Sequence, residues 1–239
     1  MKTALVLSYL GRDYHGWQRQ NNALTIQQLI EDAWLKTCGS PAYLSGCGRT
    51  DAGVHAKYYV ASTDAPTTIP LSRLPAALNA RLPEGVVIHR AVAVEDSFDA
   101  RFSCVKKEYT YLIHNGRTRD PFFTDRAWFY PQKLDVDAME RAARDLVGKQ
   151  DFAAVKNEGT PVKSTVRTIF YCHVERRGGE MIAIRVCADG FLYNMVRAIT
   201  GTLVYVCIGK IAPEGIPAIL QSRDRLRAGP TAPPCGLYM

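Results

Sequence analysis

The 239-residue chain lacks any apolar run close to the roughly 20 residues that a membrane-spanning helix needs. A short apolar run lies at residues 4–7, but no small-residue cleavage site follows it, so the run is more typical of a strand than of a signal peptide. We therefore expect a cytoplasmic protein. The 47% hydrophobic content is that of a globular chain with one large domain or two small ones.

Cysteine and histidine spacings typical of metal sites or disulfide frameworks are also missing. The seven cysteines are odd in number and scattered, no Cys-x-x-Cys pair occurs, and the five histidines fall at no zinc spacing. Most of the cysteines have apolar neighbours, as small buried hydrophobic side chains do. We expect neither a disulfide nor a metal ion.

There is no acidic excess, because 30 Lys and Arg outnumber 23 Asp and Glu and give a net charge of +7. This modest basic excess suits a polyanion-binding protein or an ordinary basic enzyme, and charge alone does not separate them. The cations form short clusters along the chain (Lys106-Lys107, Arg117 with Arg119, Arg176-Arg177), which favours a folded basic surface over a disordered arm.

Periodicity predicts the element order β-α-β-β-α-β in the first hundred residues. Thr25 to Gln28 fits a capping box, and Ile26, Leu29, Ile30, Ala33 and Trp34 then recur at helical spacing up to Gly39. The other expected elements are strands at about 3–10, 42–47 and 54–63, a short helix from Ser72, and a strand that opens at Val86. This order is the split βαβ, or ferredoxin-like, arrangement.

The second half predicts a similar order. We expect a strand at 109–113 and a helix that Asp135 caps and that ends before Gly148. One face of this helix carries Met139, Ala142, Ala143 and Leu146. A hairpin of 167–176 and 181–188 through Gly178-Gly179, a long helix from about Leu192 and a short helix near 214–222 should follow. We therefore predict an α+β fold with two ferredoxin-like halves, 1–103 and 104–239. Their sheets would lie side by side as a central mixed sheet with an active-site cleft, and the loop 114–131 is the largest insertion.

The segment Gly46–Ala56 combines one carboxylate, Asp51, with two potential cations, Arg49 and His55, and three glycines between strand-like residues. A glycine-rich turn can approach a substrate closely and hold an acid in a fixed, partly exposed position. An Asp in a turn often only stabilises the turn through its own backbone. That explanation would be preferred for an isolated Asp-Ala-Gly.

Three further segments matter for function. Aromatic and cationic residues alternate in Phe98–Phe102 and Lys106–Tyr111, which suits looped RNA, although an ordinary strand explains the pattern equally and is favoured on pattern alone. In the helix from Leu192, Arg197 is displaced by about 140° from Leu192, so it should face away from the apolar stripe. It could be solvated or point toward Asp51. The apolar finish of 231–238 favours docking over a frayed tail.

Taken together and in order, these segments resemble the tRNA pseudouridine synthase A family. The matching segments are Tyr9 with Gly16–Gln20, Gly46–Ala56, Phe98–Phe102, Tyr109, Leu146–Phe152, Phe191–Arg197 and the tail. The eleven-residue match around Asp51 is far more specific than a short motif, and the resemblance spans nearly the whole chain.

The resemblance implies a homodimer that isomerises uridine to pseudouridine at positions 38, 39 and/or 40 of the tRNA anticodon stem-loop, with no organic cofactor. It makes Asp51 the nucleophile, Tyr109 the tyrosine against the target base, and Arg197 the partner of the aspartate. Segment 156–161 departs from the more familiar sequence of the family. The implied RNA contacts are Tyr109, Arg49, Lys57, Phe98, Asp99, Ala100, Arg101, Phe102, Lys106, Lys163 and Arg167.

Two other functions remain open from the residues alone. A non-catalytic RNA-binding protein would fit the basic charge but would not need Asp51 in a loop flanked by cations. A nucleoside hydrolase would usually need a second carboxylate as general acid, and none stands out in the matched segments. The reaction products separate the three functions: pseudouridine, unchanged RNA or free uracil.

Overall fold

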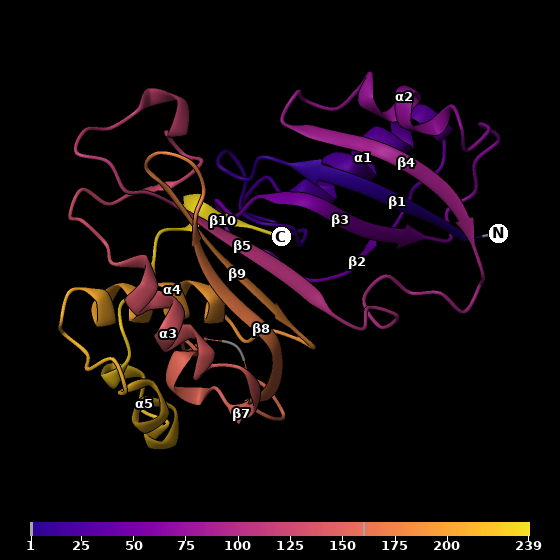
Figure 1. Ribbon diagram of the computed structural model, residues 1–239. Helices are drawn as coiled ribbons and strands as arrows, with labels where there is room; N and C mark the ends of the chain where they lie inside the picture. The colour runs from indigo at the N-terminus through magenta and orange to yellow at the C-terminus, as the bar shows by residue number, and fades with distance from the viewer. Residues whose placement is uncertain (1, 160) are drawn as a thin grey trace. The chain divides into compact units, whose positions relative to one another are not determined.

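The computed structural model describes residues 2–159 and 161–239, which form two compact units (Figure 1). The first unit contains the residues up to Val105 together with Tyr238–Met239, and the second contains Lys106–Leu237. Each unit is built on its own sheet, and the fold is α+β as expected. No helix among the described residues is long and apolar enough to cross a membrane.

The first unit has the predicted β-α-β-β-α-β order. Its elements are β1 (Lys2–Tyr9), α1 (Ile26–Cys38), β2 (Ser45–Gly46), β3 (Ala56–Thr63), α2 (Leu74–Asn79) and β4 (Val86–Val94). The strand order is β2-β3-β1-β4 with antiparallel neighbours throughout, which is the ferredoxin-like arrangement. Strand β2 is shorter than predicted, so the Asp51 loop between β2 and β3 is correspondingly longer.

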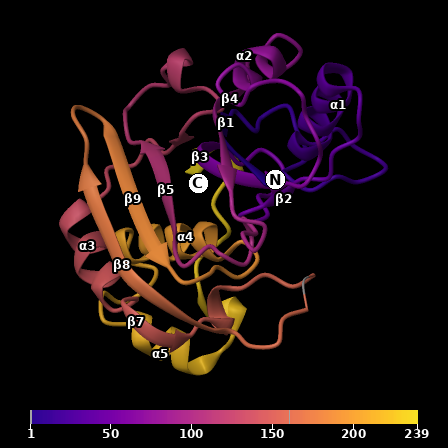
Figure 2. The same cartoon turned by 90° about the vertical axis from the view of Figure 1, so that its right-hand side faces the viewer.

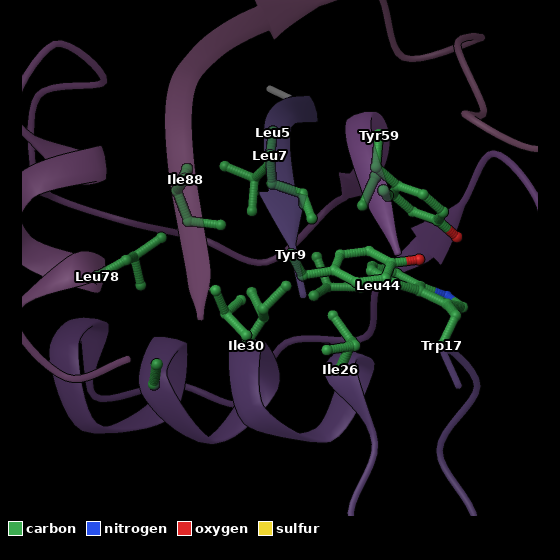
Figure 3. Packing of buried hydrophobic residues seen from close by; sticks show 14 of the residues in the cluster. Leu5, Leu7, Tyr9, Trp17, Ile26, Ile30, Leu44, Tyr59, Leu78 and Ile88 are labelled. Carbon is green, nitrogen blue, oxygen red and sulfur yellow. The ribbon is translucent and has the colours of Figure 1, made fainter. Parts of the chain in front are cut away.

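The core of the first unit lies between its sheet and α1 (Figure 3). Ile26 and Ile30 on α1 pack against Leu5 and Leu7 on β1, and all four side chains are fully buried. Burying such a side chain contributes roughly 1.5–3 kcal/mol. The start of α1 is confirmed, because the Thr25 hydroxyl accepts a hydrogen bond from the backbone N–H of Gln28.

The second unit repeats the strand order of the first. Its elements are β5 (Lys107–His114), η1 (Pro121–Phe123), β6 (Trp128–Phe129), α3 (Val136–Arg144), β7 (Gly148–Asp151), η2 (Ala153–Val155), β8 (Val166–Arg176), β9 (Met181–Ala188), α4 (Met195–Cys207), α5 (Ile216–Ser222), η3 (Arg225–Arg227), η4 (Pro234–Gly236) and β10 (Leu237–Tyr238). Figure 2 shows β5, β9 and β8 in this order. The full order is β10-β5-β9-β8-β7, so β10 takes the place of the fourth ferredoxin-like strand and β7 extends the edge. Of the two residues of β10, Leu237 is counted with the second unit and Tyr238 with the first.

Two boundaries in the second unit differ from the prediction. Helix α3 ends at Arg144, and Gly148 opens strand β7 with a φ of 108° instead of terminating the helix. Helix α4 begins at Met195, because Asn194 before it has a left-handed φ of 58°. The Asp135 cap and the Gly178-Gly179 hairpin are confirmed, the latter by positive φ values at both glycines.

The tail docks as predicted. The Tyr111 hydroxyl donates a hydrogen bond to the Pro233 carbonyl at 2.7 Å, and in the first unit the Met239 N–H donates to the His55 carbonyl at 3.0 Å. A Cβ added to Gly201 on α4 would lie 1.8 Å from the Pro230 carbonyl oxygen. Helix α4 is therefore buried on more than its predicted apolar stripe, because the tail covers a second face.

Candidate active site

The backbone around Asp51 is held in a tight turn in the first unit. The Val54 N–H donates to the Asp51 carbonyl at 3.2 Å, and Gly53, with a φ of 78°, donates its N–H to the Tyr14 carbonyl at 3.2 Å. The Asp51 side chain is half-buried, and its neighbours Arg49 and Ala52 are exposed. This is the fixed, partly exposed carboxylate that the glycine-rich segment indicates.

Three stacked aromatic side chains support this turn. The Trp17 and Tyr59 rings stack with centroids 4.2 Å apart, and the Tyr59 hydroxyl donates to the Gly48 carbonyl. The Tyr9 hydroxyl lies 2.8 Å from the Thr50 Oγ1 atom. Burial raises the pKa of Tyr9 far above its usual value, so this hydroxyl stays neutral and can donate. The residue before Asp51 is therefore held by a buried phenol.

Two glycines allow the supporting segments to approach the turn closely. A Cβ on Gly16, whose φ is 82°, would lie 2.3 Å from the Thr50 carbonyl oxygen. A Cβ on Gly46 would lie 2.2 Å from the Tyr59 hydroxyl oxygen. The Trp17 N–H also donates to the Thr50 carbonyl at 3.1 Å. The sequence analysis did not assign this supporting role to Gly16 and Gly46. The pair Gly16-Trp17, a glycine directly before a large aromatic residue, is the sequence signal that could have indicated it.

His55 closes the other side of the loop. It is 1% exposed, and its Nδ1 atom accepts a hydrogen bond from the Gly11 N–H at 2.9 Å. That nitrogen carries no proton in this geometry, so His55 acts here as an acceptor and not as the cation considered from sequence. The Tyr238 ring stacks on the imidazole with centroids 4.7 Å apart, and the Lys57 N–H donates to the Met239 carbonyl at 2.7 Å.

The predicted RNA contacts of the first unit differ in exposure. Arg49, Lys57, Arg101 and Phe102 are exposed, and the Arg101 guanidinium lies 5.2 Å from the centroid of the Phe102 ring. Phe102 is 80% exposed, which makes it the most accessible of these aromatic side chains. A cation beside an exposed ring is a surface on which a nucleobase can stack.

Asp99 and Ala100 have structural partners, and Phe98 is half-buried. Burial acts to raise the pKa of Asp99, but hydrogen bonds from the Phe102 and Arg101 N–H groups and from the Ser45 hydroxyl outweigh it, so the net pKa is lowered. The Ala100 side chain is buried, and its N–H donates to the Ser62 hydroxyl at 3.0 Å. These two residues shape the turn that presents Arg101 and Phe102.

Tyr109 and Arg197 both belong to the second unit. Tyr109 lies on β5, is 7% exposed, and meets the Phe191 ring edge-on with centroids 5.0 Å apart. The half-buried Arg197 donates from Nε to the Ala232 carbonyl and from Nη1 to the Asn194 Oδ1 atom, both at 2.7 Å. The Ala232 N–H returns a bond to the Arg197 carbonyl. Arg197 is thus ordered by the start of its own helix and by the tail.

The remaining predicted contacts are Lys106, directly before β5, Lys163 in the segment before β8, and Arg167 on β8. Lys106 and Lys163 are exposed, and Arg167 is half-buried with Nη1 donating to the Ser164 and Val166 carbonyls at 3.0 and 2.6 Å. Arg167 therefore holds the segment before β8 and keeps only part of its guanidinium for a ligand. Within residues 2–159 and 161–239, no group of three His, Cys, Asp or Glu side chains is placed to hold a metal ion.

Known proteins resemble this chain over nearly its full length. A family model described as tRNA pseudouridine synthase matches residues 5–103 and 142–239. A protein named tRNA pseudouridine synthase A from Thermoanaerobacter sp. (strain X514) is 45% identical over 235 residues, covering 98% of this chain and 96% of that one. Its namesake from Methylacidiphilum infernorum is 44% identical, covering 98% and 92%.

Among solved structures, the crystal structure of a Cbf5-Nop10-Gar1 complex matches with a TM-score of 0.35 and 13% identity, covering 84% of this chain and 53% of that one. The sequence matches carry the assignment, since they include the Asp51 loop and the segment with Arg197. The chain therefore belongs to the tRNA pseudouridine synthase family, a family of isomerases.

Proposed function

We propose that the chain isomerises uridine to pseudouridine in tRNA, at position 38, 39 and/or 40 of the anticodon stem-loop, with Asp51 as the nucleophile. The observation that carries the proposal is a half-buried carboxylate on a loop whose backbone is held on both sides, in a chain that belongs to this family. A nucleophile needs this combination of access and fixed position.

The reaction rearranges bonds without net oxidation or group donation. The N1–C1′ glycosidic bond breaks, the uracil turns, C5 bonds to C1′, and the proton lost from C5 is matched by one gained at N1. A carboxylate serves either by attacking the sugar or the base, or by stabilising positive charge at C1′. The Asp51 carboxylate thus supplies the chemical group that the isomerisation requires.

Tyr109 and Arg197 have separate roles in the proposal. Tyr109 lies against the target base, and its buried ring, braced by Phe191, gives a rigid surface for that contact. Arg197 pairs with Asp51, which lowers the pKa of a carboxyl group and keeps it ionised at neutral pH. A guanidinium also holds both carboxylate oxygens in one plane, which an ammonium does not.

The RNA must also expose its target. A stem base leaves its stack before a carboxylate can reach it, at a cost of a few kcal/mol. Arg101 with Phe102, and the exposed Arg49, Lys57 and Lys106, supply cations for phosphates and an aromatic face for a base. We also propose Lys163 and Arg167 as tRNA contacts.

The test is Asp51→Asn, which keeps the size of the side chain and removes its charge. We expect tRNA binding to survive and pseudouridine formation to disappear, measured by tritium release from C5-labelled tRNA and by chemical mapping of positions 38 to 40. Asp96→Asn, at an exposed carboxylate of the same unit, is the matched control and should behave like the wild-type chain. Wild-type activity in Asp51→Asn would exclude the nucleophile role.

Product analysis also tests the alternatives. Free uracil would indicate hydrolysis, and bound but unchanged tRNA would indicate a binding protein without activity.

We further propose that the chain acts as a homodimer in the cytoplasm. Light scattering of the purified protein tests the homodimer, and cell fractionation tests the location.

A further inference from the structure

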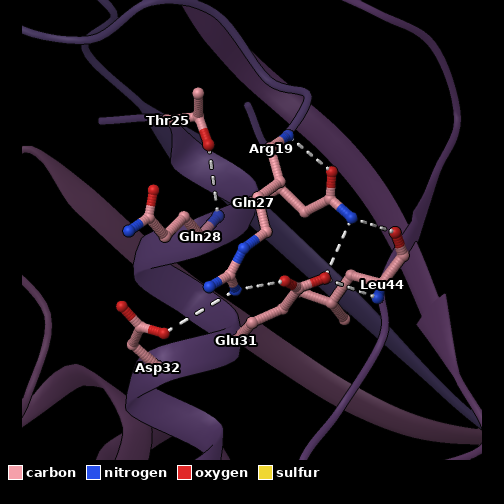
Figure 4. A network of polar contacts seen from close by, with 7 residues as sticks. All are labelled: Arg19, Thr25, Gln27, Gln28, Glu31, Asp32 and Leu44. Carbon is pink, nitrogen blue, oxygen red and sulfur yellow. Dashed lines mark hydrogen bonds and ion pairs between the residues drawn. The ribbon is translucent and has the colours of Figure 1, made fainter. Parts of the chain in front are cut away.

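Two polar side chains of α1, Gln27 and Glu31, are almost completely buried and have no part in the chemistry proposed above. They are 3% and 6% exposed, and they lie one helical turn apart with Gln27 Nε2 donating to Glu31 Oε1 at 2.9 Å (Figure 4). Burying a carboxylate costs free energy unless the carboxylate is fully hydrogen-bonded, so the partners of this pair must explain why it is buried.

One set of contacts joins this pair to the residue before β2. The Leu44 N–H donates to Glu31 Oε1 at 3.1 Å, and the Leu44 carbonyl accepts from Gln27 Nε2 at 3.1 Å (Figure 4). Both backbone polar groups of Leu44 are therefore satisfied by side chains of α1 and not by a neighbouring strand. The entry into the Asp51 loop is attached to the helix.

A second set joins the pair to the segment that packs under Asp51. The Gln27 N–H donates to the Trp17 carbonyl at 3.0 Å, and the Arg19 N–H donates to Gln27 Oε1 at 2.9 Å. The Arg19 Nη1 atom donates to Glu31 Oε2 at 3.0 Å (Figure 4). The two segments that hold the Asp51 loop thus meet at the same two side chains.

The neighbours of the Glu31 carboxylate are all donors. Its three partners are the N–H groups of Leu44, Gln27 and Arg19, which use both carboxylate oxygens. A carboxylate accepts on both atoms, whereas an amide of the same shape turns an NH₂ group toward at least one donor. The site therefore selects Glu over Gln on hydrogen-bonding grounds alone.

Between this pair and Asp51, every second residue of the chain is anchored. Leu44 binds Gln27 and Glu31, Gly46 lies against Trp17 and Tyr59, the Gly48 carbonyl accepts from Tyr59, and the Thr50 carbonyl accepts from Trp17. These contacts run from Leu44 to Thr50, the residue before Asp51.

We infer that Gln27 and Glu31 are positioning residues for Asp51, acting through Leu44 on one side and the Trp17 segment on the other. This inference rests on the proposed function of Asp51. A carboxylate displaced by about 1 Å can lose about a hundredfold in rate, so a buried contact away from the substrate can govern the chemical step.

The experiment compares Glu31→Gln with Asp32→Asn. Asp32 also faces Arg19, at 3.8 Å, but its side chain is 46% exposed, so its variant is the matched control. We expect Glu31→Gln to lower the single-turnover rate at saturating enzyme by about tenfold or more, with tRNA affinity within about twofold of wild type, and Asp32→Asn to change neither. Equal rates in Glu31→Gln and wild type would overturn the inference.

Leu78→Ala separates positioning from simple loss of stability. Leu78 is fully buried on α2, and Figure 3 shows it on the opposite side of the core from Leu44 and Trp17, so its truncation destabilises the unit away from the Asp51 loop. Below the melting temperature of each variant, Leu78→Ala should keep the wild-type single-turnover rate. A rate loss in Leu78→Ala equal to that in Glu31→Gln would contradict a positioning role.

Hydrogen exchange gives a readout that does not depend on the reaction. Amides of a peptide covering 44–51 should exchange faster in Glu31→Gln and unchanged in Asp32→Asn. If Glu31→Gln does not fold, Gln27→Met, which keeps volume and removes the bond to the Leu44 carbonyl, takes its place with the same expectations. Asp51→Asn is measured in parallel. Full activity of Asp51→Asn would reject only the role of Asp51 as nucleophile. Unchanged hydrogen exchange of 44–51 in Glu31→Gln would reject the positioning role of Glu31.

Discussion

Asp51 and Arg197 are fixed in opposite ways. The Asp51 loop is held through its backbone, by bonds to Thr50, Gly53 and Val54, while the carboxylate is partly exposed. The Arg197 side chain is itself bound, by the Ala232 carbonyl and by Asn194. The first residue depends on glycines that let other segments approach, and the second depends on a tail that supplies an acceptor. Substitutions that change the backbone conformation should therefore disturb the position of Asp51 more than that of Arg197. Substitutions that change the guanidinium should disturb the contacts of Arg197 more.

Among substitutions outside Asp51 itself, the largest effect is expected for Gly16→Ala. The new Cβ would meet the Thr50 carbonyl at 2.3 Å in a residue with a φ of 82°, so the turn before Asp51 must move. We expect activity to fall by about a hundredfold, measured by single-turnover kinetics. Gly39→Ala is the control, because Gly39 has a φ of 72° but nothing within 4 Å of its Cβ position. Gly39→Ala should lower the free energy of unfolding by about 1 kcal/mol and leave the activity unchanged. Equal activity loss in both variants would place the effect in backbone strain and not in the loop.

A smaller effect is expected for Arg197→Lys. Lysine keeps the charge but lacks the Nε–H that binds the Ala232 carbonyl and the planar group proposed to pair with Asp51. Loss of a charged hydrogen bond predicts a rate about tenfold lower or more, with tRNA binding nearly intact. Single-turnover rates test the first part, and hydrogen exchange of 229–234 tests release of the tail. A wild-type rate in Arg197→Lys would show that neither feature matters for the reaction.

Weaker changes are expected in RNA affinity. Arg101→Ala and Lys106→Ala each remove an exposed cation, so tRNA affinity should fall a few-fold, and the slope of log affinity against log salt should drop by about 1 for each phosphate that the variant no longer neutralises. Lys36→Ala, at an exposed lysine in the last turn of α1, is the control. Filter-binding titrations at several salt concentrations measure the slopes, and a flat salt response of the wild-type chain would argue against a basic RNA-binding surface.

The smallest effect concerns stability and pH in the second unit. A hydrogen bond from Thr165 lowers the pKa of Asp151, burial opposes it, and the Ala153 N–H and Arg223, at 2.9 Å, lower it further. Because the folded pKa is depressed, the stabilisation is present above the unfolded pKa of about 3.9 and is lost as pH falls through the folded value. Asp151→Asn should therefore cost up to about 1 kcal/mol at pH 7 and nothing at low pH, measured by urea unfolding. If the difference in unfolding free energy between Asp151→Asn and the wild-type chain does not change with pH, the effect comes from packing and not from the charge of Asp151.

Local signals in the sequence predicted much of the fold. Thr25 and Asp135 cap helices, and Gly178-Gly179 turns a hairpin, because each of these residues acts through its own backbone neighbourhood. The apolar faces of α1 and α4 followed from helical spacing, and four of the five residues predicted on α1 are buried, with Leu29 only partly so. The Asp51 loop was identified by the resemblance of its eleven residues to the family and not by composition alone.

Contacts between distant segments could not be predicted in this way. Gly148 was expected to end a helix, but the pairing of β7 with β8 makes it a strand residue. Gln27 and Glu31 have the spacing of an ordinary pair on a helix surface, and only Leu44 and Arg19 show why they are buried. The second face of α4 likewise depends on a tail some thirty residues further along the chain.

The place of Tyr238 and Met239 also affects how the protein is made. These residues belong to the first unit, where they cover His55 next to the Asp51 loop, yet the ribosome adds them after the whole second unit. Domains generally fold as they emerge from the ribosome, so the first unit can form its sheet and helices early. The cover over its loop is then added only when the second unit has been synthesised. A nascent or truncated chain is therefore expected to contain a folded first unit whose loop still lacks this support.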